Sequence, residues 1–247
     1  MPSLTDDDLL AREQQVFAVV RALLPRLGAQ GLTMDKVAAE VDFSKGTLYN
    51  HFRSVEDLLL AFLTAEFKVH QGWFERAALF RGRARERFLA LALAAQLADQ
   101  ELGCDELPPS FIADDQVFAK ATAETRERFQ EAHRTTFSIF TGVVRDGIAA
   151  GDLPSSVSPA LVSTAGWSLF MGAAELYRAR LIFVGEPAET FGAATQQMFL
   201  HLLDGFAWKP LSTEHDYTAT IARILRDVFP AEALKLGLLA DGGTRES

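Results

Sequence analysis

The sequence predicts an all-α protein, with an N-terminal three-helix helix-turn-helix domain and a larger C-terminal helical domain. Residues 32–60 show two short helical patterns around a tight turn, the arrangement of a DNA-reading helix-turn-helix. Elsewhere apolar residues recur at helical spacing, and no segment alternates as a strand does. The 247 residues, 49% of them hydrophobic, suffice for two domains of ordinary size. We place these domains at 1–54 and 55–247.

The first short helix of the motif is predicted to begin after Thr33, a residue suited to the N-cap position. Met34, Val37 and Val41 recur at the i, i+3 and i+7 positions, which predicts one buried face. Asp42 is expected in the following turn, where a left-handed backbone is often required. Asp adopts that conformation more readily than most non-glycine residues.

The second short helix is predicted at 45–52, with Ser44 as its N-cap. Leu48 and Phe52 are one turn apart and are expected to point inward. Small, hydroxyl and amide groups are expected to point outward, at Gly46, Thr47 and Asn50. Such a face can approach another surface closely, and the first-turn N–H groups and the helix dipole favour an anion such as phosphate. These are the requirements of a helix that reads the DNA major groove.

The segment SKGTLYNHF at 44–52, followed by Ser54 and by EDLL at 56–59, closely resembles the N-terminal domain of TetR-family transcriptional regulators. The resemblance covers roughly residues 9–63 and implies binding to double-stranded operator DNA. It implies phosphate contacts from Thr33, Lys45, Tyr49 and His51, and places Lys45, Gly46, Thr47 and Asn50 nearest the base edges. The predicted DNA-binding set is Thr33, Ser44, Lys45, Gly46, Thr47, Tyr49, Asn50 and His51.

Two positions depart from the family pattern. The family usually has glycine where this chain has Asp42, and lysine where it has Val55. The first change adds a negative charge near DNA, and the second removes a phosphate contact. The resemblance therefore implies a lower DNA affinity than is usual in the family.

Charge gives the N-terminal domain no general attraction to DNA. The chain has a net charge of -9, and residues 1–60 hold six Lys or Arg against nine Asp or Glu. Asp6, Asp7 and Asp8 are expected in an N-terminal tail, and local potential rather than net charge decides binding. A local basic edge is expected from Arg12, Lys36, Lys45 and Arg53. So few phosphate-neutralising groups favour binding as a dimer.

The rest of the chain is predicted to form helices separated by glycine and proline. The expected helices lie at 55–80, 83–102, 115–150 (long enough for two), 159–183, 187–208 and 216–229. Gly151 suits a helix C-cap, and Pro159 and Pro187 suit helix starts.

The helices at 159–183 and 187–208 are expected to form a homodimer. Residues 145–153 resemble the stretch with which many TetR-family proteins end a long helix before their last pair. Apolar positions suited to close packing are Leu161, Ala165, Leu169, Gly172 and Ala173, then Phe191, Ala194, Met198, Leu202 and Phe206. Internal packing is the alternative, but helix-turn-helix proteins normally work as two-fold pairs.

A small-molecule effector site is expected among the helices between residues 83 and 177. Candidate lining residues are Phe118, Phe137, Phe140, Trp167, Phe170, Met171 and Tyr177, with His133, Glu175, Gln96 or Thr136 as polar anchors. The 19 phenylalanines suit an apolar or aromatic effector, although a large core explains them equally well.

Enzyme signatures are missing from the sequence: there is no P-loop, dinucleotide-binding fingerprint, G-x-S-x-G elbow or pair of histidines at i, i+4. We therefore predict no catalytic residues, no cofactor and no metal. His201 and Asp204 share a helical face without a third ligand and are interpreted as surface groups. A cationic run is formed by Arg81, Arg83, Arg85 and Arg87. It is interpreted as a solvated helix start, with contact to nucleic acid as the alternative.

A single cysteine, Cys104, excludes an intrachain disulfide. The N-terminus lacks the pattern of a signal peptide, and no apolar run reaches membrane-spanning length. A cytoplasmic location is expected.

Together these patterns predict a homodimeric, ligand-responsive transcriptional regulator, and we expect it to be a repressor. A small apolar or aromatic effector is expected to release it from a pseudo-palindromic operator. Two alternatives stay open. One is an effector-independent architectural or partner-binding DNA protein of the same fold, and the other is an all-α binding or catalytic protein that no longer reads DNA.

Overall fold

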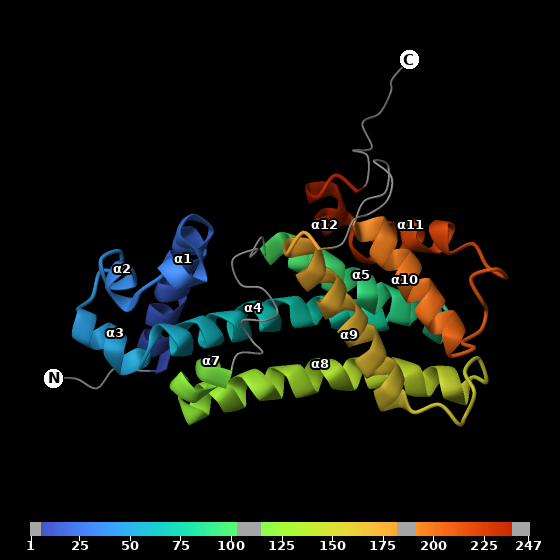
Figure 1. The fold of residues 1–247 in the computed structure, drawn as a ribbon, viewed down its shortest axis with the longest axis horizontal. Coiled ribbons are helices and arrows are strands. Elements are labelled where there is room, and N and C mark those ends of the chain that lie inside the picture. The colour runs from blue at the N-terminus through green and yellow to red at the C-terminus, as the bar shows by residue number, and fades with distance from the viewer. Residues whose placement is uncertain (1–5, 103–114, 182–190, 239–247) are drawn as a thin grey trace, which may run out of the picture. The chain divides into compact units, whose positions relative to one another are not determined.

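The computed structural model describes residues 6–102, 115–181 and 191–238, and in these ranges every regular element is a helix (Figure 1). The helices are α1 Asp6–Gly31, α2 Met34–Ala38, α3 Lys45–His51, α4 Val55–Ala78, α5 Ala84–Leu102, α7 Asp115–Lys120, α8 Ala123–Ala149, α9 Pro159–Arg178, α10 Phe191–Gly205, α11 Tyr217–Val228 and α12 Pro230–Lys235. The predicted all-α fold is confirmed. None of these helices is both long and apolar enough to cross a lipid bilayer.

Two compact units divide the chain. Residues up to 68, together with 102–133, form the N-terminal unit, and residues 69–101, together with those from 134 onward, form the C-terminal unit. Helices α4 and α8 each contribute to both units.

The core of the N-terminal unit is built from α1 to α3 and the first half of α4. The ring of Phe17 on α1 lies 6.1 Å from that of Phe52 and 5.9 Å from that of Phe62, between ring centroids. The same core buries Val37 from α2 and Leu48 from α3. Each short helix of the motif is thereby held by one apolar face.

Helix α1 begins earlier than the sequence suggested. Asp6, Asp7 and Asp8 form its first residues, so their prediction as a tail is wrong. Acidic residues are favoured there because the N-terminus of a helix carries partial positive charge.

Helix α5 is the central helix of the C-terminal unit. All residues from Phe88 to Ala98 are buried, because this stretch of α5 is apolar at every position except Gln96. The Phe88 ring lies 5.7 Å from that of Phe140 on α8 and 5.3 Å from that of Trp208, which follows α10. Gly147 on α8 allows Trp208 to approach, since a Cβ there would lie 2.8 Å from the indole.

The helix boundaries of the C-terminal unit follow the predicted signals closely. Gly151, at φ 78°, follows the end of α8, which confirms its predicted capping role. Pro159 is the first residue of α9. The residue before it, Ser158, caps the helix by accepting a hydrogen bond from the backbone N–H of Leu161. Helix α9 ends at Arg178, before the predicted position 183. The predicted helix start at Pro187 lies outside the described residues.

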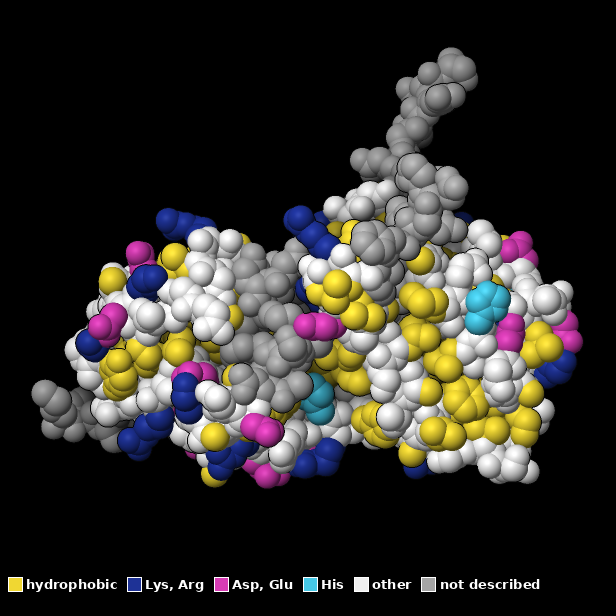
Figure 2. Space-filling model, viewed as in Figure 1, with side chains coloured by type: hydrophobic (Ala, Val, Ile, Leu, Met, Phe, Trp, Pro, Cys, Tyr) yellow, Lys and Arg dark blue, Asp and Glu magenta, His cyan; other side chains and the backbone are white. Residues whose placement is uncertain are grey.

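Helices α9 and α10 contact each other and leave apolar side chains on the surface. Figure 2 shows hydrophobic side chains gathered over these two helices. Exposed members on α9 are Leu161, Leu176 and Tyr177, and Met198 on α10 is exposed as well.

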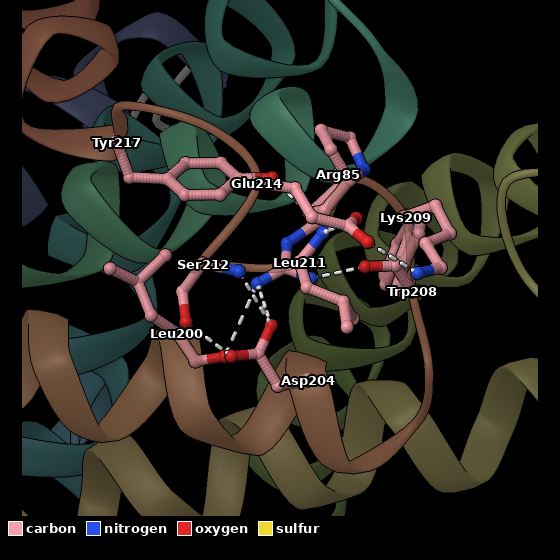
Figure 3. A network of polar contacts seen from close by, with 10 residues as sticks. Arg85, Leu200, Asp204, Trp208, Lys209, Leu211, Ser212, Glu214 and Tyr217 are labelled. Carbon is pink, nitrogen blue, oxygen red and sulfur yellow. Dashed lines mark hydrogen bonds and ion pairs between the residues drawn. The ribbon is translucent and has the colours of Figure 1, made fainter.

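A buried arginine joins the start of α5 to the segment that follows α10 (Figure 3). Arg85 is fully buried, and its Nη2 lies 2.6 Å from Oδ1 of Asp204. It also donates to the carbonyl oxygens of Trp208 and Leu200, and its guanidinium lies 4.8 Å from the centre of the Tyr217 ring. The interpretation of the arginine run as solvated is therefore wrong at Arg85. Asp204, read as a surface group, is the half-buried partner of this cation.

Helix α11 is joined to α5 by the ion pair between Arg223 and Glu86, at 2.8 Å, and α12 contacts α4 and α5. Helix α12 was not predicted, since it is only six residues long. The ring of Phe229 lies 6.3 Å from that of Trp73 on α4. Glu232 pairs with Arg76 of α4 at 2.5 Å, and Lys235 pairs with Glu101 of α5 at 2.7 Å. The C-terminal helices thus complete the core of the C-terminal unit.

Candidate nucleic-acid interface

The two short helices of the motif begin at the predicted caps. The Thr33 hydroxyl accepts a hydrogen bond from the backbone N–H of Lys36 at 3.3 Å, at the start of α2. The Ser44 hydroxyl accepts one from the backbone N–H of Thr47 at 3.2 Å, at the start of α3. These bonds satisfy helix N–H groups that otherwise lack partners and fix where each helix starts.

Helix α3 presents the predicted contact residues because its opposite face is buried. Leu48 is fully buried, and Phe52 at the helix end is nearly so. Exposed positions are Ser44, Lys45, Gly46, Tyr49 and Asn50, whereas Thr47 and His51 are half-buried. A Cβ at Gly46 would meet only the Ser44 hydroxyl, at 3.8 Å, so this end of the helix is open to a close approach.

Lys45 is the cation at the start of α3. Its Nζ lies 2.5 Å from Oδ1 of Asp35 on α2, and 5.7 Å from the centre of the Tyr49 ring. The hydrogen bond to Asp35 raises the pKa of Lys45, so its charge is retained at neutral pH. Asp35 therefore competes with DNA phosphate for this cation.

Asp42 lies in the turn between α2 and α3, as predicted, and its side chain is exposed. Its backbone is not left-handed, however. Among the described non-glycine residues, only Arg180 and Ala207 have positive φ. The expectation of a left-handed residue at position 42 is wrong, because the change of direction is spread over three bend residues, Val41, Asp42 and Phe43.

A groove of about 690 Å³ opens beside α3 in the N-terminal unit. It is formed by the start of α1, the end of α3 with the turn into α4, and the start of α8. Its lining residues are Leu9, Leu10, Arg12, Glu13, Thr47, Asn50, His51, Phe52, Arg53, Ala61, Thr122, Glu124, Thr125 and Arg128. Figure 2 shows Lys and Arg side chains interspersed with acidic ones on this unit. The groove combines three arginines with outward residues of α3.

Asp57 holds the end of the motif in place. Its carboxylate is buried and accepts hydrogen bonds from the backbone N–H groups of Arg53 at 3.0 Å and Thr122 at 2.9 Å. The backbone N–H of Asp57 donates to the Ser54 hydroxyl at 3.0 Å. Sequence reasoning did not single out Asp57, although the spacing Ser54-x-x-Asp57 is close to that of a capping box.

Two of the effector candidates, Phe118 and His133, lie in the N-terminal unit around Phe129. The ring of Phe118 lies 5.7 Å from that of Phe129, and the ring of His133 lies 4.2 Å from it. His133 also stacks on Phe67 at 4.3 Å, and its Nδ1 lies 3.0 Å from the Phe129 carbonyl oxygen. Burial lowers the pKa of His133, so its imidazole is neutral at pH 7.

The other effector candidates lie in the C-terminal unit. Phe140 contacts Trp167 at 5.9 Å and Phe74 at 5.6 Å, between ring centroids. The Thr136 hydroxyl, one turn before Phe140, is buried without a hydrogen-bond partner among the described residues. Of the remaining candidates, Phe170 is buried, Phe137, Met171 and Glu175 are half-buried, and Tyr177 is exposed. Gln96 is buried and accepts a hydrogen bond from Gln196 at 3.4 Å.

The motif is also found by comparison with known families. Residues 19–62, from α1 to the first part of α4, match the model described as bacterial regulatory proteins, tetR family. This stretch of the chain is therefore similar to the DNA-binding domain of that family. The matched stretch contains both short helices of the predicted helix-turn-helix, α2 and α3.

Solved structures share the fold of this chain over most of its length. A transcriptional regulator of the TetR/AcrR family from Thermobifida fusca is 22% identical, with a TM-score of 0.56 over 79% of this chain and 98% of its own. FadR from Bacillus subtilis, solved in complex with stearoyl-CoA, is 14% identical, with a TM-score of 0.62 over 78% and 98%. The fatty acid degradation regulator FadR from Bacillus halodurans is 12% identical, with a TM-score of 0.58 over 82% and 97%. No curated protein sequence matches the chain.

Two residues beside this candidate interface have no counterpart in the predicted set. Asp57 supports the turn after α3, and Arg128 reaches the groove from α8. Arg128 lies 75 positions beyond Arg53, the last residue of the predicted basic edge. No local pattern links positions so far apart, so only the fold could bring them together.

Proposed function

We propose that this chain is a homodimeric repressor of the TetR family, released from a pseudo-palindromic operator by a small apolar or aromatic effector. The exposed face of α3 carries the proposal. It combines a retained cation at Lys45 with the small residue Gly46 and the amide of Asn50, on a helix anchored by Leu48. Amide and cationic groups of this kind read base edges in the major groove.

Individual contacts are assigned on the same basis. Thr33, Lys45, Tyr49 and His51 would bind phosphates, and Lys45, Gly46, Thr47 and Asn50 would lie nearest the bases. Ser44 would act through its cap on α3. We assign residues 1–54 to DNA binding and residues 55–247 to effector binding and dimerisation. A bacterial regulator that binds DNA acts in the cytoplasm, where we place this protein.

The apolar surface of α9 and α10 is the proposed dimer interface. Leu161, Gly172 and Leu176 are exposed along one face of α9, with Ala165 and Leu169 half-buried between them. A Cβ at Gly172 would meet nothing within 4 Å, so a second helix has room to approach there. Small and large apolar residues on one helical face favour close helix packing. Ala173 is buried inside the subunit and therefore contributes to internal packing instead.

The proposed effector is an apolar molecule held among aromatic side chains. Phe140 and Trp167, with the unpartnered hydroxyl of Thr136 one turn away, combine apolar walls with one polar group. FadR from Bacillus subtilis, which has the same fold, was solved in complex with stearoyl-CoA. That likeness makes stearoyl-CoA the first effector to test.

Release from DNA would be a shift between two dimer populations. An effector that binds better to a dimer with wrongly spaced α3 helices lowers operator affinity. A coupling free energy of about 1–3 kcal/mol changes affinity by roughly 5- to 150-fold.

Selection of bound sequences from random DNA by the purified protein tests DNA reading. A pseudo-palindrome supports the proposed dimeric repressor. Lys45→Ala should then weaken binding to the selected duplex. Recovery of no sequence motif would favour an all-α protein that no longer reads DNA.

The effector is tested on the selected duplex by fluorescence anisotropy, with stearoyl-CoA as probe and coenzyme A alone as control. If stearoyl-CoA releases the DNA and coenzyme A alone does not, an acyl effector is supported. If no apolar compound releases the DNA or raises the melting temperature, the effector-independent alternative is favoured.

A further inference from the structure

Three arginines from different parts of the chain line the groove beside α3. Arg12 comes from α1, Arg53 from the turn into α4, and Arg128 from α8. The groove also contains Asn50 and His51 from the end of α3. A ligand in this groove would therefore lie directly against the DNA-reading helix.

The three cations are available to different degrees. Arg53 is exposed and has no ion pair among the described residues. Arg12 is half-buried, with its guanidinium 5.7 Å from the centre of the Phe43 ring. Contact with the face of a ring leaves a guanidinium charge unneutralised. Two positive charges of the groove therefore have no carboxylate partner within the described part of the chain.

Arg128 covers a carboxylate and still exposes its own charge. Both of its terminal nitrogens lie 3.3 Å from Oε1 of Glu13 on α1. The side chain of Glu13 is 15% exposed, whereas that of Arg128 is 44% exposed. The guanidinium is thus on the solvent side of the pair, where it can bind a second anion with its remaining N–H donors.

We propose that Arg128 binds the DNA sugar-phosphate backbone, together with Arg53 and Arg12, on the strand flanking the site read by α3. The inference rests on the DNA binding of this family and adds a contact from α8, a helix that contributes to both units. A DNA strand offers phosphates at regular intervals, which suits cations spread along a groove.

Fluorescence anisotropy of the selected duplex, titrated at several salt concentrations, tests the contact. Arg128→Ala should weaken binding roughly tenfold, the effect of losing one hydrogen-bonded charge contact. The slope of log Kd against log salt should fall by about 0.9 per subunit. Arg145→Ala, an exposed arginine further along α8, is the matched control and should change neither quantity.

A second pair of variants separates charge from folding. Glu13→Gln frees Arg128 from its carboxylate, so it should tighten DNA binding, and this gain should shrink in an Arg128→Ala background. If Arg128→Ala lowers the melting temperature, the Glu13→Gln/Arg128→Gln double variant replaces it in the binding experiment. This double variant leaves no unpaired carboxylate at position 13.

The outcomes are distinct. Unchanged affinity for Arg128→Ala, or weaker affinity at an unchanged salt slope, overturns the contact while DNA binding stands. If inorganic phosphate binds at Arg128 and Arg128→Ala leaves DNA affinity unchanged, the proposed DNA contact is overturned in favour of a small-anion site. Failure of the wild-type protein to select any DNA overturns both this contact and the proposed function.

Discussion

The carboxylate of Asp57 accepts a hydrogen bond from the backbone N–H of Thr122, at 2.9 Å, although the two residues lie 65 positions apart. Its other oxygen accepts from the backbone N–H of Arg53 at 3.0 Å. One buried side chain thus fixes the turn after α3 to the start of α8 within the N-terminal unit. Both bonds need an acceptor oxygen, and a carboxylate supplies two.

Asp57→Asn should therefore lower the free energy of unfolding by about 2 kcal/mol. The amide keeps one acceptor oxygen but places an NH₂ group against a backbone N–H donor, which leaves a buried group unsatisfied. Urea denaturation measures the change. Asp115→Asn, an exposed carboxylate at the start of α7, should have little effect. Equal stabilities of the two variants would show that the Asp57 bonds are replaceable.

Arg85→Met should destabilise the C-terminal unit by about 3–5 kcal/mol, because it removes one partner of a buried ion pair. Asp204 would lose its cation, and the carbonyl oxygens of Trp208 and Leu200 would lose a donor. Arg81→Met, at an exposed position of the same sequence run, is the control. A loss below about 1 kcal/mol for Arg85→Met would contradict the role of this network.

Stability should fall in acid because of His133. Burial between Phe67 and Phe129 lowers its pKa in the folded state below the ordinary value of 6.5. Between the folded and unfolded pKa values the unfolded chain binds more protons, so the free energy of unfolding decreases as pH falls through 6.5. This loss ends below the folded pKa. His133→Gln, which does not titrate, should flatten the curve of melting temperature between pH 7 and pH 5, and a curve identical to the wild type would refute the assignment.

Leu176→Asp should dissociate the proposed dimer, because it puts a charge into an apolar interface between subunits. Leu234→Asp on α12 is a close control, since Leu176 is 44% exposed and Leu234 is 43% exposed. Analytical ultracentrifugation at matched concentrations reports the change in mass. If Leu234→Asp dissociates the dimer and Leu176→Asp does not, the dimer interface is formed by the C-terminal helices instead.

The local features of the DNA-reading motif could be predicted from the sequence, because each depends on residues within about four positions. Thr33 and Ser44 cap the helices that follow them, and Leu48 and Phe52 share the buried face. Gly151 likewise ends α8. Caps, turns and helical faces are local properties of the backbone, so short patterns suffice to identify them.

The environment of charged residues was decided by the tertiary structure. Arg85 belongs to a run that resembles a solvated helix start, yet it is fully buried because Asp204 and Trp208, more than 110 positions away, supply its partners. Arg128 reaches the groove beside α3 only because α8 begins next to Asp57 and Glu13. The sequence by itself determined the all-α class and the reading helix. Only folding determined which charges are buried and paired, since that depends on residues distant in sequence that are brought together in three dimensions.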